Sequence, residues 1–496
     1  MDQLSLIAIF PELVLLVMAC AIAMVDLGVK SAQRTTTYVL SLVALAMVAY
    51  LTLGFALDGQ TNYGFGKQMV NDPLGNWLKF FATIAVAVTL VYARPYAAAR
   101  GMLRGGEIFS LSLFSLLGMF IMIGGNNFLV IYLGLELLTL SSYALVALRR
   151  DDANATEAAM KYFVLGALAS GFLLYGLSML YGATGSLELG EVFKQVSNPS
   201  VPKQVLVFGV VFIVAGLAFK LGVVPFHMWV PDVYHGAPTS VTLMIGGAPK
   251  IAAFAICIRL LVEGMIPLAV DWQQMLVVLS VASLVVGNLA AIAQTNIKRM
   301  LAFSTIAQMG FMLLGLVSGV VNGNTLSAAN AYSASMFYVL TYVLTTLAAF
   351  GVIMLLTREG YESEEITDFA GLNQRSPLYA AVMAICMFSL SGIPPAVGFY
   401  AKLSVLQALI ESQQTGAVVL AVFAVMMSLI GAFYYIRLVK VMYFDEPLHQ
   451  VDAISAPKDV RTVLSVNGAL VLLLGIFPGA LMTICLNAVL KSLAAF

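Results

Sequence analysis

The sequence predicts an all-α polytopic membrane protein with about fourteen transmembrane helices. The 496 residues are 61% hydrophobic and only 10% charged, with a mean hydropathy of +0.96, whereas a soluble globular chain is about 25% charged. A chain this apolar cannot cover its own surface with polar side chains, so lipid must be the solvent for much of it. Apolar runs of about 20 residues, the length that a membrane core requires, recur along the whole chain.

These apolar runs set the predicted helices, one after another. A transmembrane barrel would instead need short strands of alternating polarity, a pattern that the sequence does not show. The runs lie near residues 4–25, 36–57, 74–93, 107–124, 126–148, 157–181, 205–229, 240–262, 272–294, 299–319, 329–356, 378–410, 416–442 and 462–489.

Basic residues alternate between the loops and predict the orientation. The odd-numbered loops hold fifteen Lys and Arg residues, against four in the even-numbered loops and the C-terminus together. Such an excess marks the cytoplasmic side, and an even number of helices then places both termini on the periplasmic side. No loop has room for a soluble domain, so the redox chemistry of any complex must belong to other chains.

Composition and motifs argue against several other classes of protein. The net charge is zero and no basic patch indicates nucleic acid. The four cysteines form no CxxC motif, so neither a structural zinc nor a cysteine-ligated cluster is indicated. We find no GxGxxG turn and no haem-ligand pair, which argues against a redox enzyme acting alone.

A few ionisable residues remain inside the predicted spans and are the candidate site. An ionisable side chain at a helix centre costs about 2.5–3.5 kcal/mol on insertion scales, so such residues usually face the protein interior and mark ion pathways. These residues are Glu136, Lys161, Lys220, Lys250 and Lys402.

Each candidate also has a purely structural interpretation. Lys161 lies near the cytoplasmic end of its helix, where it can snorkel or pair with Glu157 one turn earlier. Spacing alone does not decide between these interpretations. Glu136 lies near mid-helix with Thr139 and Tyr143 on the same face, which makes a polar stripe and favours function.

Prolines and glycines interrupt the helices that carry the three central lysines. Lys220 precedes Pro225, Lys250 directly follows Pro249, and Lys402 follows a Gly-Ile-Pro-Pro sequence that begins at Gly392. Each proline frees a backbone carbonyl one turn earlier, and at membrane depth that carbonyl needs a partner from protein or water. A simple kink is the alternative, but a lysine beside an interrupted helix is typical of transporter sites near the membrane midplane.

Histidines near Lys220 extend the candidate site. His227 lies seven residues after Lys220, and an unbroken helix would put both on one face. A histidine titrates near pH 6.5 and can relay protons, although His227 could equally be a packed polar residue. Asp232 and His235 follow near the cytoplasmic surface, where they could feed protons inward or cap a helix.

Buried lysine and glutamate together suit proton transfer. A free lysine, with a pKa of about 10.4, holds its proton too tightly to release it near pH 7. Burial favours the neutral amine, whereas a carboxylate about 4 Å away favours the ammonium by about 4 kcal/mol at an effective dielectric constant of about 20. Glu136, the only acid that we place near a membrane centre, is therefore the candidate switch.

Four stretches resemble the proton-antiporter family of respiratory complex I. Residues 219–239 read FKLGVVPFHMWVPDVYHGAPT, residues 159–163 read AMKYF, residues 298–310 read KRMLAFSTIAQMG, and residues 389–395 read SLSGIPP, with Lys402 following. Together they span most of the chain. This combination is far more specific than a single short motif.

Within the family, the chain is most similar to the N-type subunits. Lys402 stands on the twelfth helix, where M-type subunits have a glutamate, and the chain ends without the long lateral helix of L-type subunits. The Gly-Ala-Pro-Thr stretch also runs on into Ala248-Pro249-Lys250. His235 departs from the pattern, because many relatives have an acid there, so no family role is carried to that position.

The resemblance implies an architecture of two inverted five-helix repeats with broken helices. Residues 1–104 would form helices 1–3, residues 105–263 the first repeat, residues 264–443 the second repeat, and residues 444–496 a loop and helix 14. The residues themselves support the repeats weakly, through the similar spacing of Gly222 to Pro225 and of Gly392 to Pro395.

The resemblance also implies roles for the candidate residues. Glu136 and Lys220 would be the coupling pair, and Lys250, reached past His227, the central relay. Lys402 would exchange protons with the outside, and Lys161 would act on the inner side.

Partners and location follow from the same resemblance. This chain would hold no cofactor, because FMN, iron–sulfur clusters and quinone would belong to partner subunits. The partners would be the lipid bilayer and other membrane subunits of complex I, including M-type and small ones, in a bacterial inner membrane. Nucleic acid is not expected.

Two other functions stay open at this point. A subunit of a multi-subunit cation/proton antiporter or of a membrane-bound hydrogenase would share the fold and the lysines. A structural membrane scaffold without an ion path would tolerate apolar replacements of the central lysines.

Overall fold

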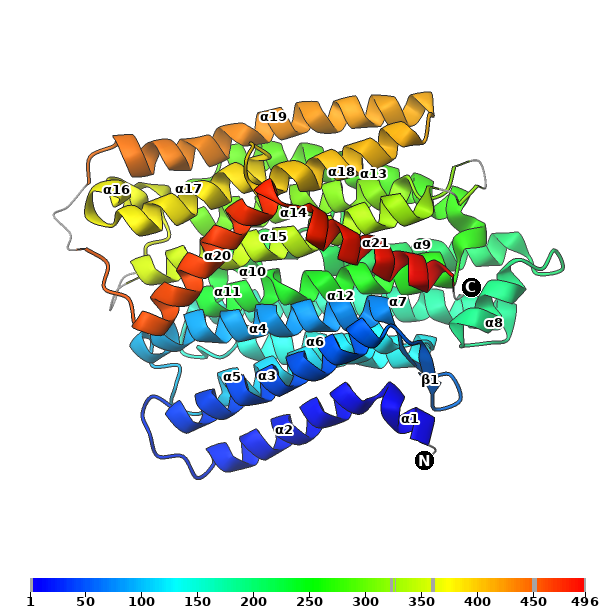
Figure 1. The fold of residues 1–496 in the computed structure, drawn as a ribbon, viewed down its shortest axis with the longest axis horizontal. Coiled ribbons are helices and arrows are strands. Elements are labelled where there is room, and N and C mark those ends of the chain that lie inside the picture. Colours follow the sequence, from blue (N-terminus) through cyan, green and yellow to red (C-terminus); the bar gives the residue numbers. More distant parts are fainter. Residues whose placement is uncertain (1–2, 322–323, 326, 358–361, 448–452, 495–496) are drawn as a thin grey trace.

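The chain folds into a bundle of helices whose long axes run nearly side by side, with both chain ends at the same end of the bundle (Figure 1). The structure is a computed structural model, and it describes residues 3–321, 324–325, 327–357, 362–447 and 453–494. Within these residues, twelve helical segments are long and apolar enough to cross a membrane, and two shorter apolar helices accompany them. The predicted class, an all-α polytopic membrane protein with about fourteen spans, is confirmed.

The helices and strands follow one another with these bounds: α1 (Gln3–Ala8), α2 (Phe10–Asp26), α3 (Thr35–Asp58), β1 (Asn62–Gly64), β2 (Met69–Asn71), α4 (Pro73–Ala99), α5 (Glu107–Gly124), α6 (Phe128–Val146), α7 (Ala153–Thr184), α8 (Leu189–Val196), α9 (Lys203–Leu221), α10 (Trp229–Gly236), α11 (Thr239–Gly246), α12 (Ala248–Cys257), the π-helical turn η1 (Ile258–Glu263), the 3₁₀ turn η2 (Ile266–Leu268), α13 (Ala269–Ile292), α14 (Ile297–Val317), α15 (Ala328–Leu356), the 3₁₀ turn η3 (Ile366–Phe369), α16 (Leu372–Arg375), α17 (Pro377–Ser391), α18 (Val397–Glu411), α19 (Thr415–Phe444), α20 (Lys458–Ile476) and α21 (Gly479–Leu493).

Four predicted spans are interrupted in the structure. The breaks fall at Gly222 between α9 and α10, at Gly247 between α11 and α12, at Gly392 between α17 and α18, and at Pro478 between α20 and α21. Gly222 and Gly392 have φ angles of 81° and 85°, a left-handed conformation that glycine adopts at little cost at a helix end. The first three breaks lie beside the prolines that predicted them.

The most enclosed helices are α14, α15 and the segment from α11 to η1. In α14 and α15, 89% of the apolar stretch is buried inside the protein, and in the segment from α11 to η1 all of it is. In α19 the corresponding share is 22%, so this helix lies on the outside of the bundle (Figure 1). Polar residues on α12 and α14 are therefore shielded from lipid by their neighbours.

The N-terminal helices α2 to α5 pack against one another and against the segment that contains α12. A short antiparallel hairpin, in which Asn62 of β1 faces Asn71 of β2, connects α3 to α4. This hairpin lies at the same end of the bundle as the two chain ends (Figure 1).

Candidate functional site

The end of α9 exposes backbone carbonyls inside the protein. The amides of Gly222 and Val223 turn back onto carbonyls of the last helical turn. The next amide, that of Val224, donates instead to Ser283 Oγ over 2.9 Å, and Pro225 has no N–H to donate. The last two carbonyls of α9 are therefore left without a backbone donor.

The side chain of Lys250 donates hydrogen bonds to these two carbonyls. Its Nζ lies 2.8 Å from the carbonyl oxygen of Leu221 and 3.4 Å from that of Lys220, and it stands 5.4 Å from the centre of the Trp229 ring. Lys250 is 1% exposed and belongs to the first turn of α12. The carbonyls that we predicted to be freed next to the prolines thus accept hydrogen bonds from a lysine.

The end of α17 has the same construction about 170 residues later. The amides of Gly392 and Ile393 return to carbonyls of the last turn. The next two residues are Pro394 and Pro395, which have no N–H. The last two carbonyls of α17 are left without a backbone donor for the same reason.

Lys402 occupies this second helix end. Its Nζ lies 3.0 Å from the carbonyl oxygens of both Leu390 and Ser391 and 2.7 Å from Ser428 Oγ on α19. The ammonium also stands 5.0 Å from the centre of the Phe311 ring. Lys402 is 8% exposed, so both central lysines are buried at the C-terminal end of a half-helix.

This position suits a buried cation. A helix carries a partial negative charge of about half an elementary charge at its C-terminal end, and this charge stabilises a cation. Broken helices whose free carbonyls face an ion are typical of transporter sites near the midplane. Because no carboxylate forms an ion pair with Lys250 or Lys402 among the described residues, these dipoles and aromatic rings are what stabilise the ammonium groups.

Lys220 lines a small cavity between α6, α7 and α9, and Glu136 stands on α6 next to Leu135, which also lines it. The cavity of about 10 Å³ is lined by Lys220, Thr139 and Ser170 together with apolar side chains, which is about the space of one water molecule. Glu136 is half-buried, and its Oε1 has no hydrogen-bond partner. The two side chains form no direct ion pair in the part of the chain that the structure describes.

His227 lies in the turn between α9 and α10, not on a shared helix face with Lys220. The shared face would require an unbroken helix, and the chain leaves helical geometry at Gly222. His227 is half-buried and its Nδ1 is buried without a hydrogen-bond partner. Among the described contacts, none joins it to Lys220 or Lys250.

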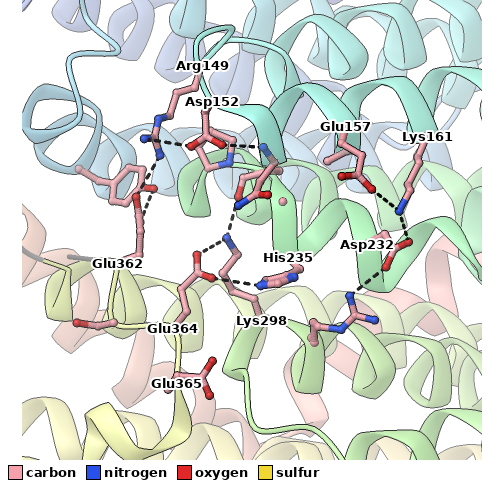
Figure 2. Close-up of a pocket in the computed structure, with 18 of the residues that line it drawn as sticks. Arg149, Asp152, Glu157, Lys161, Asp232, His235, Lys298, Glu362, Glu364 and Glu365 are labelled. Atoms are coloured by element: carbon pink, nitrogen blue, oxygen red, sulfur yellow. Dashed lines mark hydrogen bonds and ion pairs between the residues drawn. The ribbon is translucent and has the colours of Figure 1, made fainter. Parts of the chain in front are cut away.

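Lys161 lies at the edge of a vestibule, a charged cavity of about 430 Å³ at one end of the bundle. Figure 2 shows its ammonium between two carboxylates, with Glu157 and Asp232 each 2.9 Å away. Asp232 also accepts from Arg299 over 3.0 Å. Lys161 is thus a partly exposed member of an ion-pair network, which fits the surface alternative as well as an inner-side role.

The far wall of the vestibule is built around Lys298 (Figure 2). The Lys298 ammonium is 1% exposed and donates to Glu364 and to the carbonyl of Ala237, both over 2.8 Å. The other oxygen of Glu364 lies 3.7 Å from His235 Nε2. His235 therefore takes part in the vestibule, although no family role was assigned to it.

A cluster of neutral polar groups surrounds the carbonyl that holds Lys402. Gln308 of α14 donates to the Leu390 carbonyl over 2.9 Å and to the Tyr435 hydroxyl over 3.0 Å, and it accepts from the Tyr338 hydroxyl. Tyr435 also bonds to Ser304. The sequence analysis quoted Ser304 and Gln308 only as part of a family motif, because neutral side chains give no signal in a search for intramembrane charge.

The sequence analysis missed several buried charges in the bundle. Glu12 of α2 and Lys79 of α4 form an ion pair of 2.5 Å, and Arg259 binds Asp72 and Glu263 at 2.6 and 2.7 Å. All five side chains are buried. Glu12, Lys79 and Arg259 stand inside predicted spans, so the list of five intramembrane charges was incomplete.

No group of three or more His, Cys, Asp or Glu side chains that could hold a metal ion occurs among the described residues. The four cysteines are free thiols, and three of them are buried.

The family model described as NADH:quinone oxidoreductase/Mrp antiporter, TM, matches residues 125–428. The NADH-quinone oxidoreductase subunit N of Polaromonas naphthalenivorans (strain CJ2) is 71% identical, with 99% of each chain covered. This chain belongs to the subunit N family of NADH-quinone oxidoreductase. The resemblance to the antiporter-like subunits of complex I, and to the N-type among them, is confirmed.

Solved structures agree with the subunit N assignment. A chain of respiratory complex I from Thermus thermophilus with bound aureothin matches with a TM-score of 0.79 and 31% identity, covering 95% of this chain and 98% of that one. A chain of the Mrp complex from Dietzia sp. DQ12-45-1b shares the fold, with a TM-score of 0.85 and 20% identity over 100% of this chain and 98% of that one. As a member of the subunit N family, the chain is a multi-pass membrane subunit of a respiratory complex. This membership is consistent with a role in proton translocation.

Proposed function

We propose that this chain is a non-redox subunit that moves protons through Glu136, Lys220, Lys250 and Lys402. The redox chemistry, with FMN, iron–sulfur clusters and quinone, takes place in partner subunits. The single observation that carries the proposal is the pair of buried lysines, each bound to the two carbonyls that lack a backbone donor at the end of a broken helix.

The docking geometry explains how such a lysine can exchange a proton. Burial disfavours the ammonium, while the carbonyls and the negative helix end favour it. A change in either of these two opposing effects, such as a small movement of the half-helix, switches the lysine between holding and releasing its proton. The carbonyls can accept hydrogen bonds from the neutral amine as well as from the ammonium.

Glu136 acts on this balance from the first repeat. In our proposal its carboxylate and Lys220 are the coupling pair, linked through the water-sized cavity beside Thr139 and Ser170. Moving the carboxylate away favours release of the proton from Lys220, in the direction of Lys250. His227, whose Nδ1 is buried and unpartnered, serves as a relay beside this route.

The vestibule is the proposed uptake side. Its carboxylates and His235 can accept protons from water, and Lys161 and Arg299 hold Asp232 in place. Basic residues are concentrated at this end of the bundle, which supports a cytoplasmic position. Both termini then lie on the periplasmic side of a bacterial inner membrane.

The proposal also covers the internal repeats of the chain and its contacts with other subunits. Residues 105–263 and 264–443 act as two inverted repeats, and the matching ends of α9 and α17 support this division. We expect the chain to contact M-type and small membrane subunits of the complex as well as lipid.

A tagged chain tests the assignment to the complex. Membranes are solubilised in mild detergent and separated on a native gel that is stained for NADH dehydrogenase activity. The tag should migrate with a large NADH-oxidising band. A tag that runs apart from all NADH activity would favour a cation/proton antiporter, the alternative suggested by the shared fold, and sodium-dependent proton exchange would then be measured.

A further inference from the structure

The two lysine sites differ in whether their carbonyls have a second hydrogen-bond donor besides the lysine. The Leu390 carbonyl accepts from Lys402 over 3.0 Å and also from Gln308 over 2.9 Å. The Ser391 carbonyl accepts from Lys402 over 3.0 Å and also from the Ser428 hydroxyl over 3.3 Å. Because a carbonyl oxygen has two lone pairs, each carbonyl at the end of α17 binds two donors at once.

The site of Lys250 has no such second donors. The carbonyls of Lys220 and Leu221 accept only from Lys250 among the side chains and backbone groups that the structure describes. The nearby indole of Trp229 donates one residue earlier, to the carbonyl of Phe219, over 3.0 Å. Movement of Lys250 would therefore strand two buried acceptors, which is costly.

We propose that Gln308 and Ser428 are positioning residues for Lys402, because they supply the substitute donors that let its amino group leave the end of α17. Lys402 is then the mobile lysine of the pair, and Lys250 is the fixed one. This inference rests on the proposed role of Lys402 in proton transfer and adds the groups that control its release.

Both substitute donors are already in place before any movement. Gln308 is 5% exposed and is held by hydrogen bonds with the buried hydroxyls of Tyr338 and Tyr435. Ser428 accepts from Lys402 over 2.7 Å while its own hydroxyl hydrogen points to the Ser391 carbonyl. Neither side chain must rotate when Lys402 departs, so the helix end keeps its hydrogen bonds throughout the cycle.

The experiment measures proton pumping by the assembled complex with single and paired substitutions. Ser428→Ala removes one substitute donor, Gln308→Leu removes the other, and the double variant removes both. NADH-driven proton uptake into vesicles is recorded at matched amounts of assembled complex. Ser404→Ala is the control, because Ser404 is also buried on the helix of Lys402 but bonds only to the carbonyl of Ala401.

We expect pumping to fall by about tenfold in the double variant, since each departure of Lys402 then leaves two buried carbonyls without a hydrogen-bond donor. Each single variant should show a smaller loss, and Ser404→Ala should show none. Ser428→Thr keeps the hydroxyl and should restore pumping relative to Ser428→Ala. A merely structural role of Ser428 would not give rescue at equal assembly.

The outcomes separate this inference from the proposed function. If Lys402→Ala stops pumping while the double variant pumps normally, the positioning role is wrong and the role of Lys402 stands. If Ser428→Thr is as defective as Ser428→Ala, or if the losses follow the amount of assembled complex, the positioning role is also wrong. If Lys402→Ala itself pumps normally, the proposed function of this site fails.

Discussion

Lys250 donates to the carbonyl oxygen of Leu221 over 2.8 Å and so fills the position that a proline four residues later leaves empty. The lysine is thereby the cap of a broken helix, and in our proposal it also carries a proton. Its two tasks can be separated by experiment, because removal of the cap affects stability and removal of the amine affects proton transfer.

Lys250→Met should destabilise the protein more than Lys402→Met does. The first substitution leaves two buried carbonyls without a donor, at about 1–3 kcal/mol for each. The second leaves Gln308 and Ser428 on the same two carbonyls. The thermal unfolding of purified complexes in detergent measures the difference, and equal midpoints for the two variants would contradict our account of the helix ends.

Glu136→Gln should slow NADH-driven proton pumping without loss of assembly. The amide keeps the size of the side chain but removes the charge that acts on Lys220. We expect a fall of about tenfold, which corresponds to about 1.4 kcal/mol in the transfer step. Glu191→Gln is a matched control, since the one ion pair of Glu191 among the described residues is with Lys194 on the surface helix α8. A similar loss in both variants would point to a nonspecific effect.

Arg259→Met should destabilise the packing of α4 and α5 against η1. Arg259 is 2% exposed and holds the carboxylates of Asp72 and Glu263, and it also donates to the carbonyl of Ile123. Removal of one partner from a buried ion network typically costs about 3–5 kcal/mol. Lower yield and a lower unfolding midpoint of the complex would show this, whereas an unchanged midpoint would mean that the network is replaceable.

Asp232→Asn should impair pumping more than Lys161→Ala. Asp232 accepts from both Lys161 and Arg299, so loss of its charge releases two cations in the vestibule. Loss of Lys161 leaves Asp232 paired with Arg299. Pumping rates of the two variants, compared at equal assembly, test the order; a larger defect for Lys161→Ala would place the essential group on α7 instead.

The membrane spans and the helix breaks could be predicted from the sequence because both depend on local properties. Apolar length determines the spans, and the prolines after Gly222 and Gly392 determine where carbonyls lose their donors. That Lys250 and Lys402 would bind those carbonyls could not be predicted, because it depends on how α12 lies against the end of α9 and how α18 lies against the end of α17. Spacing along the chain says nothing about these contacts.

The sequence analysis missed two groups of buried residues, each for a different physical reason. Gln308 and Ser428 are neutral, and their importance lies in the acceptors that they share with Lys402. Glu12 and Lys79 are charged but lie far apart in the sequence, so neither had a visible partner. His227 shares no helix face with Lys220, because helical periodicity holds only within an unbroken helix and the chain breaks at Gly222.

The most direct test of the central claim is the proton-pumping rate of the assembled complex with Lys220→Met. This lysine makes no hydrogen bond or ion pair through its side chain among the described residues, so its removal strands no acceptor. The variant should assemble and should oxidise NADH with a water-soluble electron acceptor at the normal rate. Our account predicts that NADH-driven proton uptake into vesicles then falls by about tenfold or more. Normal proton uptake by a fully assembled Lys220→Met complex would contradict a proton path through these buried lysines.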